Sequence, residues 1–134
     1  MDLATSWQDV SLGTAAVIGI TVALLHGVLI HRLILRPLQT RVGVNAVMAR
    51  SSARLLAPLL HFSTFSWFLG GVALVSAAVW LRGDARLVTC LLVGSLYLFG
   101  AIANLWATRG RHLGWILMTV ALAMIVAGAR GSSA

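Results

Sequence analysis

The sequence predicts an all-α fold: one domain over residues 1–134, built as an integral membrane four-helix bundle with up-down topology. Hydrophobic residues make up 60% of the 134 residues, and the mean hydropathy is +0.96. A soluble domain of this size cannot bury that much apolar surface, so lipid must cover part of it. Charged residues make up only 10% and lie mainly between four apolar runs. Each run is close to the length that a bilayer requires, and without water each must be helical to satisfy its own backbone.

The four helices are predicted at residues 11–35, 53–81, 87–108 and 113–129. The first ends before Pro37, because proline does not easily continue a helix. The second contains Pro58, which removes a backbone donor, so we expect a kink just below His61.

The connections between these helices are short. Ser51 or Ser52 is a suitable N-cap for the second helix. Residues 82–86 (RGDAR) are expected to form a tight turn, and residues 109–112 (RGRH) a second, basic one. Short connections favour antiparallel neighbours in an up-down bundle.

The charge distribution predicts how the bundle sits in the membrane. The formal charge is +7, from ten basic residues, all arginine, and three aspartates. The basic residues gather in the first and third connections, whereas the aspartates lie on the other side. By the positive-inside rule, the basic connections face the cytoplasm and both termini face the periplasm of a bacterial inner membrane. We therefore expect contact with membrane lipids and no nucleic-acid binding. The expected headgroup contacts are Arg32, Arg36, Arg41, Arg50, Arg54, Arg109 and Arg111.

Three polar residues from three helices lie at matching depth. His26, His61 and Asn104 are each five to seven residues inside the nearest basic residue of their own helix. At about 1.5 Å per residue, all three lie roughly 8–11 Å below the basic layer. Polar groups inside a membrane are costly and are usually paired or functional. The candidate cofactor-binding residues are His26, His61, Asn104, Tyr97 and Trp67.

This polar layer leaves several alternatives open. The two histidines and Asn104 can hydrogen-bond across helices and hold the bundle together. Alternatively, His26 and His61 are ligands of a metal, a haem or another tetrapyrrole, since neutral imidazole is the usual axial ligand. The remaining alternatives are proton transfer and the binding of a lipid or a quinone, with His61 as a base. Tyr97 is expected to donate to a buried carbonyl rather than to a ligand.

Two classes of small membrane protein are excluded. The chain contains no glutamate, which small multidrug transporters need in their first helix. It has a single cysteine, Cys90, so it cannot be a thiol–disulfide oxidoreductase that works through cysteine pairs.

The chain carries two resemblances to known membrane proteins, one local and one broad. Residues 61–71 (HFSTFSWFLGG) resemble a helix of copper-resistance D-type membrane proteins and their haem-binding relatives. More broadly, the segments 25–38, 61–67 and 111–115 (RHLGW) resemble an uncharacterised family of four-helix bacterial inner-membrane proteins. In that family an acidic residue follows the first histidine, and this chain has His31 there instead. The broader resemblance spans most of the chain and implies an architecture but no activity.

The leading functional prediction is a non-enzymatic accessory subunit that packs against other membrane subunits or against copies of itself. The first alternative is a haem- or metal-binding redox protein with His26 and His61 as ligands. The second is a lipid- or quinone-binding enzyme that uses His61.

Overall fold

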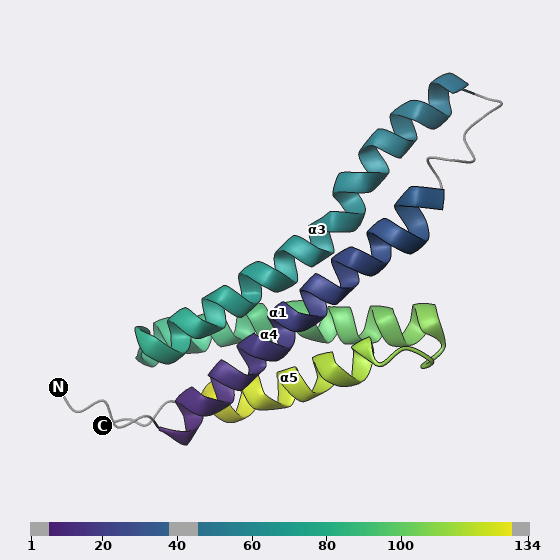
Figure 1. Cartoon of the computed structure of the whole chain (residues 1–134). Coiled ribbons are helices and arrows are strands. Elements are labelled where there is room, and N and C mark those ends of the chain that lie inside the picture. Colours follow the sequence, from purple (N-terminus) through teal and green to yellow (C-terminus); the bar gives the residue numbers. More distant parts are fainter. Residues whose placement is uncertain (1–5, 38–45, 130–134) are drawn as a thin grey trace.

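The computed structural model describes residues 6–37 and 46–129, except for the side chains of residues 46–54. Its elements are α1 (Trp7–Leu29), η1 (Ile30–Leu35), α3 (Ala46–Val79), α4 (Gly83–Thr108) and α5 (Gly114–Ala129). Because η1 continues α1 without a break, the described residues form four helical rods and no strand (Figure 1). The all-α prediction is confirmed.

The four rods pack as neighbouring pairs. α1 and α4 each pack against both α3 and α5. The first turns of α1 and α4 and the last turn of α5 meet at one end, where Arg86 binds Asp9 and the carbonyl of Gly128. The C-terminal ends of α1 and α4 therefore lie at the opposite end of the bundle. Figure 1 shows that α3 runs alongside α1 over much of its length.

Two of the helices, α1 and α4, start earlier than predicted. α1 begins at Trp7 and not at residue 11, because Ser6 and Asp9 form a capping box across its first turn. α4 begins at Gly83 and not at residue 87, with Arg82 as an extended N-cap. The predicted tight turn over residues 82–86 is therefore wrong, and Arg86 is a helical residue.

α3 also starts early. It is continuous from Ala46, so the predicted N-cap at Ser51 or Ser52 is wrong: both lie inside the helix. Residues 46–52 contain neither glycine nor proline, so nothing in them stops the helix. Pro58 lies within α3, and Figure 1 shows the helix bending in its first half, which contains this proline.

The end of α1 departs from regular α-helix. Residues 30–35 are wound as a π-helix, where a continuous α-helix was predicted. Ile30 and Leu35 are each only 5% exposed, whereas His31 and Arg32 between them are exposed. The wider turn thus keeps both apolar residues buried and leaves the polar pair outside.

Three helices are long and apolar enough to cross a membrane: Trp7–Leu35, Leu55–Val79 and Gly83–Thr108. α5 is apolar but has only 16 residues. Large apolar side chains cover the outside, including Phe62, Phe65 and Phe99 at 68, 61 and 73% exposure. Many of the fully buried residues are small alanines, which let helices approach closely.

Tyr97 is the central side chain of the core. It is fully buried, and its hydroxyl donates to the backbone carbonyl of Trp67 at 3.2 Å. A Cβ at Gly19 of α1 would overlap that hydroxyl, so only glycine lets α1 close over the ring. The prediction that Tyr97 donates to a buried carbonyl is confirmed.

Candidate functional site: a polar layer between two cavities

His26 lies in the last turn of α1 and faces α3. Its Nε2 is 3.2 Å from the hydroxyl oxygen of Ser63. Its ring packs on the indole of Trp67, with 4.6 Å between ring centroids and 51° between the planes. The ring is thereby positioned by two residues of α3 that lie one turn apart.

Trp67 extends from α3 to α4. It is only 6% exposed, and a Cβ at Gly100 of α4 would lie 2.8 Å from the indole atom Cζ2. Glycine at position 100 is thus what makes room for the ring. The indole N–H has no hydrogen-bond partner in the described part of the chain.

Asn104 lies one turn beyond Gly100 on α4. Its side-chain amide nitrogen donates to the Gly100 carbonyl at 2.8 Å. Its Oδ1 has no partner among the described residues. Asn104 therefore turns one half of its amide to its own helix and keeps the other half available.

Two cavities meet at these three side chains. One has a volume of about 380 Å³ and lies between α3 and α4. The other, about 300 Å³, lies between α1 and α5. His26, Trp67 and Asn104 line both cavities, so they form a shared polar wall, here called the polar layer. Apolar side chains make up most of the rest of both linings, including Phe62, Leu96 and Phe99 in the first and Leu25, Val28, Leu29, Leu113 and Leu117 in the second.

His112 forms the rim of the α1–α5 cavity. It follows a sharp turn in which Arg109 and Gly110 both have positive φ, 50° and 76°. The backbone N–H of Gly114 donates to His112 Nδ1 at 3.0 Å. This bond holds the exposed imidazole over the start of α5.

A second buried polar cluster, here called the staple, ties the other end together. Arg86 is 2% exposed; its NH1 donates to Asp9 Oδ1 at 2.6 Å, and its Nε and NH2 donate to the Gly128 carbonyl at 3.2 and 2.9 Å. The same Asp9 closes the capping box of α1. Sequence reasoning missed the staple, because a turn was predicted at residues 82–86.

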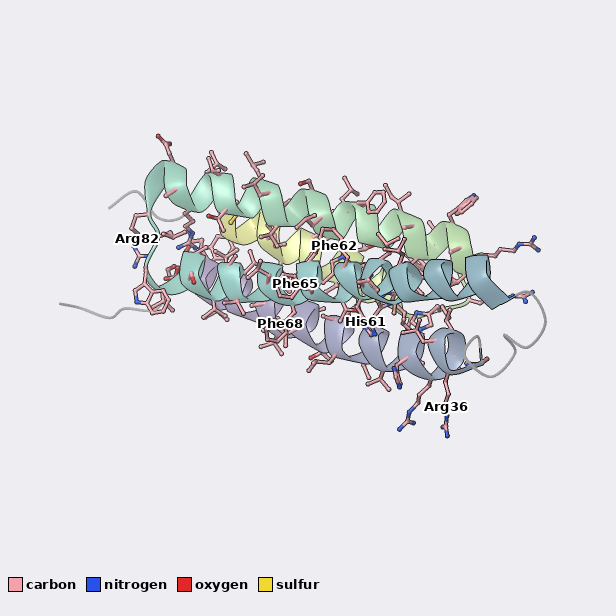
Figure 2. All side chains as sticks on the ribbon, turned by 90° about the horizontal axis from the view of Figure 1, so that it is seen from above. Arg36, His61, Phe62, Phe65, Phe68 and Arg82 are labelled. Atoms are coloured by element: carbon pink, nitrogen blue, oxygen red, sulfur yellow. The ribbon has the colours of Figure 1, made fainter. Side chains whose placement is uncertain are left out.

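The structure brings together only part of the predicted site. His26, Trp67 and Asn104 share both cavities, but His61 and Tyr97 line neither. His61 is half-buried, on a stretch of α3 whose neighbours Phe62 and Phe65 point outwards (Figure 2). Within the described ranges, no three His, Cys, Asp or Glu side chains gather as metal ligands.

Sequence reasoning also missed Ser63 as a partner of His26, and did not include His112 among the candidate site residues. The spacing of Ser63 and Trp67, four residues apart, was the available signal that both face one neighbour.

The predicted headgroup arginines lie partly inside the described ranges. Arg32, Arg36, Arg109 and Arg111 are exposed at the end of the bundle opposite the staple, and Figure 2 shows Arg36 and Arg82 at opposite ends. Arg41 lies outside the described residues, as do the side chains of Arg50 and Arg54.

Comparisons with protein-family models, with curated proteins and with solved structures give no match. The geometry of the site is therefore the basis for the function.

Proposed function

We propose that this protein is a membrane-embedded up-down four-helix bundle that binds a mainly apolar small molecule drawn from the bilayer. The observation that carries the proposal is the meeting of two apolar cavities at His26, Trp67 and Asn104. Small-molecule sites are typically apolar pockets of about 300–1,000 Å³ with a few converging polar groups. Both cavities fit that description, and both are lined by exposed apolar side chains such as Phe99 and Leu25, through which a ligand enters from lipid.

Membrane residence is supported by the distribution of side-chain sizes. Small residues fill the contacts between helices, whereas phenylalanine and leucine cover the outside. The proposed orientation places the end with Arg109 and Arg111 in the cytoplasm of a bacterium and both termini in the periplasm. A reporter fused after Ala134 should be active only as a periplasmic enzyme, and cytoplasmic activity would contradict this orientation.

The geometry favours a small ligand over a haem held by His26 and His61. A haem would need an open slot between α1 and α3. Beside His26, however, a Cβ on Gly27 would already lie 3.0 Å from the Thr64 methyl group of α3. In addition, one face of the His26 ring is covered by Trp67, and its Nε2 is engaged by Ser63.

The test is to identify what the purified protein carries. The protein would be extracted in mild detergent, and native mass spectrometry would measure bound small molecules. Val28→Phe places a ring in the α1–α5 cavity, which Val28 lines. Leu24→Phe is the matched control, because Leu24 is 58% exposed and lines neither cavity. Wild type and Leu24→Phe should retain the ligand, and Val28→Phe should lose it.

Two outcomes would contradict this proposal. Equal ligand content in all three proteins would show that the bound molecule lies elsewhere. A haem absorption band at one pigment per chain, lost in His61→Ala, would instead support the haem-binding alternative.

A second candidate function is the self-associating or accessory subunit. The observation that favours it is the outer side of α4 and α5, where a groove of about 270 Å³ is lined by Gly94, Ser95 and exposed Val126. At about 1.5 Å per residue, α5 is shorter than the hydrocarbon core, and a short helix is often accommodated by oligomerisation. A second copy of the chain is the occupant we test. Gly94→Leu should abolish a cross-linked dimer seen for the wild type; a wild-type monomer in membranes would rule this candidate out.

A further inference from the structure

The neighbours of His26 determine which of its nitrogens carries the proton in the neutral ring. The Ser63 hydroxyl lies 3.0 Å from the Leu60 carbonyl and 3.2 Å from His26 Nε2, and it has one hydrogen to donate. When that hydrogen goes to the carbonyl, the hydroxyl oxygen accepts from His26 Nε2. We assign this arrangement, in which neutral His26 is protonated at Nε2 and Nδ1 is an acceptor with no partner in the described part of the chain.

The same reasoning assigns the opposite role to His112. The Gly114 backbone N–H can only donate, so His112 Nδ1 accepts and carries no proton when the ring is neutral. The proton is on Nε2, which is left as a donor.

Two further groups belong to residues that line both cavities. Among the described residues, the Trp67 N–H is a donor without a partner and Asn104 Oδ1 is an acceptor without one. Among the described residues, Thr64 Oγ1 is the fully enclosed side-chain atom that lacks a partner. The unpaired atoms of His26, Trp67 and Asn104 are not enclosed in this way, so a ligand can reach them. These three residues and His112 all line one cavity.

We propose that the α1–α5 cavity selects neutral amphiphiles whose head is a hydroxyl group, of the phenol or quinol class. This inference rests on the proposed function and names its ligand class. A hydroxyl both donates and accepts, so it pairs with an acceptor such as His26 Nδ1 and a donor such as His112 Nε2 at once. The apolar part of the ligand lies along Leu25, Val28, Leu113 and Leu117.

Other heads match the cavity less well. An ether or a quinone carbonyl can only accept, which leaves the acceptors of His26 and Asn104 buried without a partner. A carboxylate also only accepts, and it brings a negative charge against those same lone pairs. None of the arginines with described side chains lines this cavity, so these arginines do not neutralise that charge inside it.

The experiment compares three matched compounds on the intact protein in detergent: a 4-alkylphenol, its methyl ether and the corresponding 4-alkylbenzoate. Isothermal titration calorimetry measures each Kd. The phenol should bind about tenfold more tightly than the ether, the ratio expected for one buried polar group left unpaired. In His26→Phe that ratio should fall to about twofold or less. His31→Phe is the control and should keep the full ratio, because His31 is exposed and lines neither cavity.

The outcomes distinguish a failure of the hydroxyl selectivity from a failure of the proposed function on which it rests. If the ether binds the wild type as tightly as the phenol, the cavity binds apolar ligands and the hydroxyl selectivity is wrong. If the benzoate binds most tightly, the positive charge at the basic end determines binding, and the proposed hydroxyl selectivity is also wrong. If none of the three binds, both proposals fail. Asn104→Leu provides a second variant at the site, and it should also lower the phenol-to-ether ratio.

Discussion

The two ends of this bundle treat buried polar groups in opposite ways. In the staple, three donor nitrogens of Arg86 have partners, which are Asp9 and the Gly128 carbonyl near the end of α5. In the polar layer, His26, Trp67 and Asn104 each keep one hydrogen-bonding atom without a partner in the described residues. The staple lines neither of the two cavities that meet at the polar layer.

Under the function proposed above, the staple stabilises the fold and the polar layer binds the ligand. An unpaired buried polar group costs free energy, so a stable fold normally pairs it. The staple follows that rule and joins α1, α4 and α5. The polar layer departs from it beside two apolar cavities, which is the arrangement expected where a ligand supplies the second partner. Substitutions at the two ends should therefore change different properties.

The largest effect on stability is expected at the staple. Arg86→Met removes the guanidinium and leaves Asp9 and the Gly128 carbonyl without their partner. Removing one member of a fully buried pair costs about 3–5 kcal/mol, and we expect the lower end of that range because Asp9 is 18% exposed and keeps its hydrogen bonds to Ser6. Unfolding in mixed micelles, followed by circular dichroism, measures this loss. Arg82→Met is the control: Arg82 is exposed and bonds only to the neighbouring Leu81 carbonyl, so its loss should stay within about 0.5 kcal/mol. Equal losses of unfolding free energy in the two variants would show that the hydrogen bonds of Arg86 do not stabilise the fold.

A smaller loss is expected between the two ends, at the contact of α1 with Tyr97. Gly19→Ala places a methyl group where the Tyr97 hydroxyl lies. Overpacking of this kind costs about 1–3 kcal/mol. Gly13→Ala, where nothing lies within 4 Å of an added Cβ, is the matched control and should not destabilise the fold in the same unfolding assay. If Gly19→Ala is as stable as the wild type, the Tyr97 side chain has room to move away from the added methyl group.

Removing only the hydroxyl of Tyr97 should cost less. Tyr97→Phe keeps the buried ring and deletes the bond to the Trp67 carbonyl, which is worth about 1 kcal/mol. The double variant Gly19→Ala/Tyr97→Phe should recover part of the free energy of unfolding that Gly19→Ala loses, because the oxygen that clashes with the added methyl group is gone. Strict additivity of the two free energies of unfolding would contradict this contact.

The smallest effect on stability is expected in the polar layer. Asn104→Ala removes a side chain that donates to the carbonyl of its own helix, so it should change the free energy of unfolding by less than about 1 kcal/mol. The same variant should lose most of its bound ligand in native mass spectrometry. A large destabilisation with unchanged ligand content would show that the polar layer is structural, which is one of the alternatives that the sequence leaves open.

Much of the fold follows from composition. Apolar runs near bilayer length must form helices, and the observed helices overlap the predicted ranges, with starts shifted by one to seven residues. Matching depths grouped His26 with Asn104, because a constant rise per residue converts sequence distance into height, and the two residues line the same two cavities. His61 was placed at the same depth, but it lines neither cavity.

The direction in which each residue faces was decided by tertiary structure. In a helix that is apolar on every side, the hydrophobic pattern carries almost no information about which face meets a neighbour. Only packing shows that Ser63 and Trp67 meet His26, that Gly100 admits the indole, and that Arg86 is buried rather than in a turn. The sequence by itself determined that the chain is helical, how long its apolar runs are and which end is basic. The contacts between helices decided which polar groups of the described residues have a hydrogen-bond partner and which do not, because those contacts join residues far apart in the sequence.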